Sequence, residues 1–228
     1  MFHNGFFARR VGVLLGVLAS ASLVNADDLS KYRPFQFGMD LAKASEAGGM
    51  HVSDAKVIYR RPALIQELTW RPERAQLFSI SDPVTDVVLS FYNGELFRIA
   101  VEYDRYKTKG MTTADMTEAI SAIYGTAVLP VDEIAVASNL RGNMNVVARW
   151  EDSQYVCNLL HPTDEPLFYF ILSSKRLDAM ARSAIVEAVR IDAEQAPQKE
   201  IDDRNKQEQD RLLQLENARV ANKPKFRP

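Results

Sequence analysis

Two runs of alternating apolar residues surround the tripeptide Tyr92-Asn93-Gly94, and this feature constrains the fold more than any other. The alternating side chains are Val87, Leu89 and Phe91 before it and Phe97, Ile99, Val101 and Tyr103 after it. Alternation with a period of two predicts an antiparallel β-hairpin with one apolar face.

The register of this hairpin decides its loop. A two-residue Asn-Gly loop would set Arg98 opposite Leu89, whereas a three-residue loop would pair Leu89 with Phe97 and gather the apolar side chains on one face. We therefore predict a type I turn with Gly94 in the left-handed region, followed by a bulge.

Three further segments have helical periodicity. Asp40 can cap a short helix that runs through Ala47 and stops at Gly48-Gly49, and Thr112 with Asp115 forms an N-terminal capping pattern for a helix that ends at Gly125. The third helix is amphipathic and covers residues 177–194. Its apolar stripe consists of Leu177, Met180, Ala181, Ala184, Ile185, Ala188 and Val189.

The remaining pattern is that of short strands. Alternation predicts strands that end in Trp70 and Trp150, and residues 154–160 and 167–172 form a second hairpin whose loop contains His161. Residues 126–142 are a connection. The predicted fold class is α+β.

The order of these elements repeats. Met39 and Met111 lie 72 residues apart, and at the same offset Glu46 matches Glu118. Each short helix is followed by a strand that ends in tryptophan and then by a hairpin. We predict two similar units of a helix on an antiparallel sheet, residues 27–106 and 107–196, each burying its tryptophan between layers.

This pattern of Gly-Met, short helix, strand ending in tryptophan and hairpin with Asn-Gly-Glu-Leu resembles the tandem α/β modules of the β-lactamase-inhibitor-protein-like class. It is also similar to the small outer-membrane-assembly lipoproteins built on one such module. The resemblance covers residues 35–174 and implies helices on one face of a sheet, with protein binding on the exposed face. The chain lacks both the lipidated cysteine of the lipoproteins and the paired cysteines of secreted inhibitors.

The N-terminus has the pattern of a secretory signal peptide, residues 1–26. Arg9 and Arg10 precede an uncharged run, Val11–Val24, and Ala26 provides a small residue at the cleavage position. The run is shorter than the roughly 20 apolar residues of a spanning helix. We expect a periplasmic or secreted protein that meets the membrane only transiently, through this signal; retention of the signal as an anchor is the alternative.

Composition excludes some partners. Without Arg9 and Arg10 the chain has 26 basic and 30 acidic residues, a net charge of −4, which does not favour a nucleic-acid partner. The lone Cys157 has no partner for an internal disulfide and is predicted to be a buried apolar residue. Residues 197–228 are charged and predicted to be a solvated helix or disordered.

No motif for catalysis, a metal or a cofactor is present, so we expect no cofactor. His51 and His161 are the only histidines after residue 26, both expected in loops, and three or four ligands are needed for zinc. The candidate partner surface consists of Tyr92, Arg98, Tyr155 and Tyr169.

These observations favour a non-enzymatic protein-binding or envelope-assembly module, with another envelope or extracellular protein as its partner. Two alternatives stay open. One is a hydrolase-like enzyme with a site that no motif announces. The other is a carrier of a small apolar ligand between helix and sheet.

Overall fold

The computed structural model describes residues 28–72, 82–128, 134–135, 144–163, 165–225 and 227. The predicted export signal and most of the predicted connection 126–142 lie outside these residues. The fold is α+β, as predicted, with helices α1 (Leu41–Gly48), α2 (Thr113–Tyr124) and α3 (Lys175–Asn222) and short 3-10 helices η1 (Val52–Asp54) and η2 (Lys223–Lys225). The strands are β1 (Lys31–Tyr32), β2 (Phe35–Gln36), β3 (Lys56–Tyr59), β4 (Ile65–Trp70), β5 (Val84–Tyr92), β6 (Glu95–Tyr103), β7 (Ile134–Ala135), β8 (Met144–Glu151), β9 (Tyr155–Pro162) and β10 (Tyr169–Ser174).

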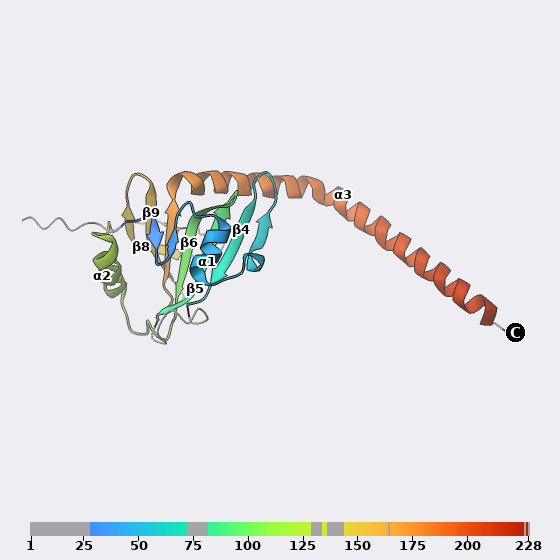
Figure 1. Cartoon of the computed structure of the whole chain (residues 1–228), viewed down its shortest axis with the longest axis horizontal. Coiled ribbons are helices and arrows are strands. Elements are labelled where there is room, and N and C mark those ends of the chain that lie inside the picture. The colour runs from blue at the N-terminus through green and yellow to red at the C-terminus, as the bar shows by residue number, and fades with distance from the viewer. Residues whose placement is uncertain are drawn as a thin grey trace, which may run out of the picture.

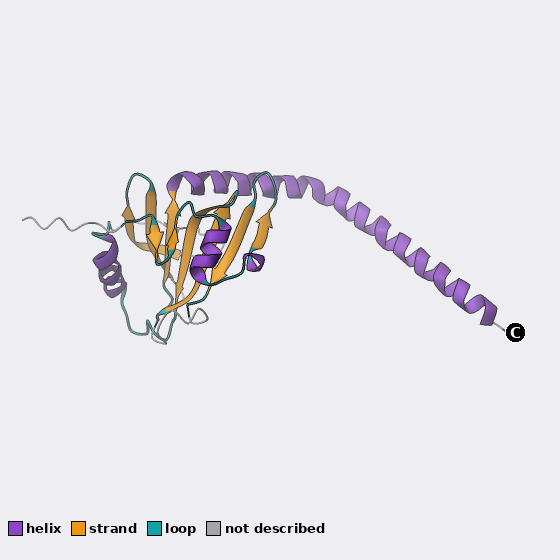
Figure 2. Cartoon of the chain, in the orientation of Figure 1, coloured by secondary structure: helices purple, strands orange, loops and turns teal. Residues whose placement is uncertain are grey.

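The described strands form one antiparallel sheet of eight strands and a small hairpin, β1-β2 (Figure 2). The order in the large sheet is β3-β4-β5-β6-β10-β9-β8-β7. The four strands that follow α1 therefore lie beside the four strands that follow α2, and the order of the second set is the mirror image of the first. The last strands of the two sets, β6 and β10, pair with one another at the centre of the sheet. Ile99 lies opposite Leu172 and Val101 opposite Phe170 at this junction.

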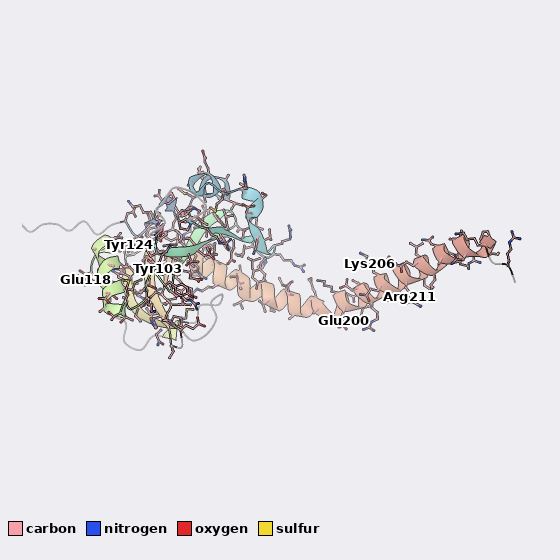
Figure 3. The ribbon with its side chains drawn as sticks, turned by 90° about the horizontal axis from the view of Figure 1, so that it is seen from below. Tyr103, Glu118, Tyr124, Glu200, Lys206 and Arg211 are labelled. Carbon is pink, nitrogen blue, oxygen red and sulfur yellow. The ribbon has the colours of Figure 1, made fainter. Side chains whose placement is uncertain are left out.

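Helices cover both faces of the sheet. The main core contains both tryptophans and buried residues of α1 and α2, such as Ala44, Met116 and Ile120. A second cluster, on the other face, packs Leu177 and Ala181 of α3 against Ile65 and Phe97. Figure 3 shows the blue α1 and the orange start of α3 on opposite sides of the strands.

The two short helices begin and end as predicted. The Asp40 carboxylate accepts a hydrogen bond from the Lys43 amide at 2.8 Å, and Gly49 ends α1 with φ of 64°. Thr112 and Asp115 form a reciprocal capping box at the start of α2, which ends at Gly125. Side-chain caps satisfy amides that the first turn leaves without partners.

The two tryptophans occupy matching positions in the two units. The Trp70 indole N–H donates to the carbonyl oxygen of Gly48, at the end of α1, at 3.0 Å. The Trp150 indole N–H donates to the carbonyl oxygen of Gly125, at the end of α2, at 2.9 Å. A phenylalanine meets each ring edge-on: Phe35 at 5.1 Å from Trp70 and Phe170 at 5.7 Å from Trp150.

The loop of the β5–β6 hairpin differs from the prediction. Tyr92 pairs with Glu95, so the loop consists of Asn93 and Gly94 alone, and their φ values are 49° and 88°. Two positive φ values are those of a type I′ turn, the usual partner of a two-residue hairpin loop. The predicted three-residue loop is therefore wrong.

A bulge two residues farther along corrects the register. Phe91 pairs with Leu96, but Ser90 pairs with Arg98 and Leu89 with Ile99, so the β6 strand contains one extra residue at this point. Leu96 and Ile99 belong to the main core, whereas Phe97 belongs to the cluster beneath α3. The bulge thus turns Arg98 to the α3 face, away from the main core.

The C-terminal helix extends beyond its predicted amphipathic part, residues 177–194, into the charged tail, for which a solvated helix was one of the two predicted states. The α3 helix begins near the predicted residue but continues through Pro197 to Asn222, a length of 48 residues. Figure 1 shows α3 crossing the sheet, changing direction close to where it leaves the sheet, and then extending away from the rest of the molecule. Such a bend is the usual result of a proline in mid-helix, which removes one hydrogen bond and crowds the preceding turn.

Candidate interaction site

Two of the four predicted partner-surface residues lie beneath α3. The Arg98 guanidinium contacts the Asp178 carboxylate of α3, with Nε at 3.0 Å and Nη2 at 2.5 Å from Oδ1. The other carboxylate oxygen of Asp178 accepts from Arg182 Nε at 2.7 Å. Tyr92 packs against the buried cluster of Ile65, Phe97, Leu177 and Ala181. The start of α3 therefore covers the sheet face that these two residues occupy.

The other two predicted residues lie elsewhere. The Tyr155 ring stacks on Phe37, with centroids 5.2 Å apart, and packs against the main core. Tyr169 packs against a third cluster, Met144, Val146 and Leu160. The structure thus does not bring the four residues together on one surface.

The buried ion pair between Arg98 and Asp178 ties α3 to the sheet. Only 15% of the Arg98 side chain and 9% of the Asp178 side chain are exposed. Both Arg98 hydrogen bonds go to Oδ1 of Asp178, and charge-assisted hydrogen bonds of this kind are stronger than neutral ones, so they hold the first turn of α3 against the sheet.

Among the residues that the structure describes, the histidines and the cysteine do not converge on one site. His51 is exposed in a loop before η1, as expected, whereas His161 lies in β9, not in the predicted loop, with its ring edge-on to Phe168 at 4.8 Å. Cys157 is buried in β9, as predicted, and burial raises the pKa of its thiol to about 12. Within the described ranges, no group of three or more His, Cys, Asp or Glu side chains is placed to hold a metal ion.

An open depression of about 400 Å³ lies where β2, the start of β9 and the start of α3 meet. Its walls are mainly polar and include Glu95, Gln154, Tyr155 and Lys175. The Lys175 ammonium already contacts the Glu151 carboxylate and the Asp152 carbonyl, each at 2.7 Å. These contacts hold the start of α3, directly after β10, against the end of β8. The depression does not bring a nucleophile together with a general base.

The C-terminal part of α3 is a solvated helix, which is one of the two states predicted for the charged tail. Near the point where α3 leaves the sheet, Gln195 accepts a hydrogen bond from the Arg61 guanidinium. Every described residue after it is exposed. We call residues 196–222 the projecting segment; at 1.5 Å per residue it is about 40 Å long. The labelled Glu200, Lys206 and Arg211 stand clear of the rest of the molecule (Figure 3).

The projecting segment exposes large apolar side chains. Their exposed fractions are 48% for Ile201, 53% for Leu212, 61% for Leu213, 56% for Leu215 and 61% for Val220. Four of the five fall within nine residues. A concentration of exposed leucine and valine on one short stretch marks a contact surface more often than a solvated one.

Exposed ion pairs run along the same segment. Glu200 pairs with Arg204, Glu208 with Arg211, and Glu216 with Arg219. Pairs of this spacing favour the helix only slightly when they are exposed. Most of the stability of a helix in a protein comes from packing of an apolar face against other parts of the structure. The segment therefore has the composition of a helix that gains stability from a partner.

The sequence contained a sign of this helix that the prediction did not use. The spacing Glu-x-x-Arg recurs at 187/190, 208/211 and 216/219, and each pair forms a bidentate contact in the structure. None of the helices in the described ranges is long and apolar enough to span a bilayer. Comparison with family models, curated proteins and solved structures gives no significant match to this chain.

Proposed function

We propose that the protein is an exported, non-enzymatic protein-binding module of the cell envelope whose docking element is the projecting segment. The two helix-on-sheet units form a platform, and α3 carries the docking element away from it. The observation that carries the proposal is the exposure of Leu212, Leu213, Leu215 and Val220 on a helix whose described residues after Gln195 are all exposed.

The anchoring of α3 supports this role. The first turns of the helix are fixed by the Arg98–Asp178 ion pair and by Leu177 and Ala181, which are buried against the sheet. Since a helix bends mainly at proline, a fixed base gives the segment a defined direction with one point of adjustment, at Pro197. A docking element held in this way loses less conformational entropy on binding than a disordered tail.

The matching settings of Trp70 and Trp150 support the internal duplication. Each indole donates to a glycine carbonyl at the end of the preceding helix, and the strand order of the two units is mirrored. We propose that the platform arose from two copies of one helix-on-sheet unit joined at β6 and β10. The proposal that the chain is exported is supported by its N-terminal sequence pattern, residues 1–26.

Site-specific photo-crosslinking tests the docking element in the intact protein. A benzoyl-phenylalanine at Leu215 is expected to give a covalent adduct with a protein in the envelope fraction. The same group at Val186 is the matched control, because Val186 is also exposed and on α3 but lies on the part anchored to the sheet. Absence of an adduct at Leu215, or equal adducts at both positions, would contradict the proposal.

A further inference from the structure

We infer that the partner of the projecting segment is the same segment of a second copy of this chain, packed against it in the antiparallel direction. This inference rests on the proposed docking role and names the partner. It is carried by the order of apolar and charged residues along one line of the exposed helix.

One line of the segment has the spacing of a coiled-coil seam. Steps of four and three residues connect seven positions: Ile201, Asn205, Glu208, Leu212, Leu215, Arg219 and Asn222. All seven are exposed and on the continuous helix α3. Alternating steps of three and four keep these positions on one side of a helix, where a second helix can pack. The two leucines are at the centre of the line.

The line is complementary to itself only when the second helix runs in the opposite direction. With the centre between Leu212 and Leu215, each leucine meets the other leucine of the second copy. In the same register Glu208 lies opposite Arg219, and Asn205 lies opposite Asn222. In a parallel pair, Glu208 would face Glu208 and Arg219 would face Arg219, and like charges at such positions disfavour association.

The distribution of charge along the segment agrees with this direction. Residues 196–210 contain five acidic and three basic residues, a net charge of −2. Residues 211–225 contain one acidic and four basic residues, a net charge of +3. Antiparallel packing brings the acidic part of one helix beside the basic part of the other at both ends of the contact. Such complementarity favours encounter and fixes the register.

The internal ion pairs do not prevent this contact. The Glu208–Arg211 and Glu216–Arg219 pairs each leave more than half of both side chains exposed, so they are held weakly. Glu208 and Arg219 can therefore exchange neighbours within one helix for neighbours on the second helix. The favourable free energy of association then comes mainly from removing Leu212 and Leu215 of both copies from water.

A lipid surface fits the segment less well. At 100° per residue, the charged Glu216 and Lys223 lie between the line of Leu212 and Leu215 and the line of Leu213 and Val220. A helix that lies on a membrane needs one continuous apolar face with its charges on the opposite side. The segment instead has two narrow apolar lines separated by charge, and a narrow line suits a second helix.

Sedimentation equilibrium of the full chain from residue 27 tests the association. We expect a reversible dimer, and we expect Leu215→Gln to weaken it at least tenfold, because two leucines leave the contact. Leu213→Gln is the matched control: Leu213 is as exposed as Leu215 but lies off the line, so the change should be under twofold. A monomer at all concentrations, or equal effects of the two variants, would overturn the inference.

Charge reversal tests the direction of the second helix. Glu208→Arg and Arg219→Glu each place like charges opposite one another and should weaken the dimer. The double variant restores opposite charges in the antiparallel pair and should return the dissociation constant to within about threefold of the original value. A parallel pair gains nothing from the double variant, so failure of this rescue would overturn the antiparallel arrangement.

A disulfide between copies gives a second measure of direction. Asn205→Cys mixed with Asn222→Cys should give a disulfide-linked dimer, whereas either variant alone should not, because equal positions are then about 26 Å apart. The native Cys157 is buried and should remain unlinked. Linkage within a single variant would overturn the inference.

The photo-crosslinking test separates this inference from the proposed function. An adduct at Leu215 with twice the mass of the chain supports both the docking role and a second copy of the chain as the partner. An adduct with a different protein, from a chain that stays monomeric, keeps the docking role and overturns the second copy as its partner. Binding of the monomeric chain to vesicles of anionic phospholipid, lost in Leu215→Gln, overturns both.

Discussion

At the scale of single residues, the two tryptophans are the points at which each helix is held to the sheet. Trp70 and Trp150 are 1% and 2% exposed, and each satisfies the carbonyl of a glycine at a helix end. Gly48 has a second role, because a Cβ atom there would lie 3.1 Å from Trp70 and 2.6 Å from Met50. A larger residue at this position would require the Met50 side chain to move and the indole ring to shift by a few tenths of an ångström.

Removing either indole should have a similar effect if the two settings are equivalent. Trp70→Phe and Trp150→Phe should each lower the free energy of unfolding by about 2 kcal/mol, because each loses buried volume and leaves a helix-end carbonyl without its donor. Urea unfolding followed by circular dichroism measures this change.

The exposed Val186→Ala is the control for that comparison and should change the free energy of unfolding by no more than about 0.5 kcal/mol. A large loss at one tryptophan and none at the other would show that the two units do not use their tryptophans in the same way.

At the scale of elements, the β5–β6 hairpin depends on its two-residue turn. Both loop residues have positive φ values, and the Asn93 side-chain oxygen also accepts a hydrogen bond from the Leu64 amide at 2.9 Å. The turn therefore positions the start of β4 as well as joining β5 to β6.

Replacing Gly94 should weaken this hairpin through the backbone alone. No atom lies within 4 Å of the place where a Cβ would be added, but the φ of 88° disfavours every L-residue. Gly94→Ala should cost about 1–2 kcal/mol of unfolding free energy in thermal denaturation. Gly94→Asn should cost less, since asparagine tolerates this region best. Equal losses for both variants would argue against a conformational cause.

The sequence was sufficient for the elements and insufficient for contacts between distant residues. Alternation and capping residues are local, so they correctly predicted β5, β6 and the ends of α1 and α2. The turn was predicted wrongly because Arg98 was treated as a charge on an apolar face. Its partner, Asp178, is 80 residues away, and the bulge that brings them together has no local sequence pattern.

The candidate site shows the same limit. Tyr92 and Arg98 were expected on an open surface because nothing in a strand pattern shows which helix will cover it. The apolar stripe of α3 was predicted only in part: Leu177 and the alanines of the stripe are buried, whereas Met180 and Val189 are exposed. The sheet face that the helix covers was not predicted. The amphipathic helix was predicted over residues 177–194 and the tail as a solvated helix or disordered. The α3 helix joins the two through Pro197, because the cost of one proline is local and the residues on both sides of it favour a helix.

At the scale of the whole molecule, a platform and a long helix have separate sources of stability. The platform is held by a continuous core on one face of the sheet and by the start of α3 on the other. The projecting segment contributes no buried side chain to either. Its loss should therefore leave the platform folded.

Deleting residues 197–228 tests that separation. The thermal midpoint should change by less than about 2 °C, while the helical signal in circular dichroism should fall by the contribution of some 26 residues. The deletion retains Gln195, so the contact with Arg61 is kept as an internal control. A fall of more than about 5 °C would show that the segment packs against the platform.

The joining of the two units at β6 and β10 also determines where strands remain unpaired. The strands left at the two borders of the described sheet are the shortest in it: β3, with four residues and an irregularity in its pairing, and β7, with two. Short and irregular borders resist the addition of another chain's strand, and with it fibril-like growth. The borders of the described sheet are thereby protected from edge-to-edge pairing with the sheet of another copy.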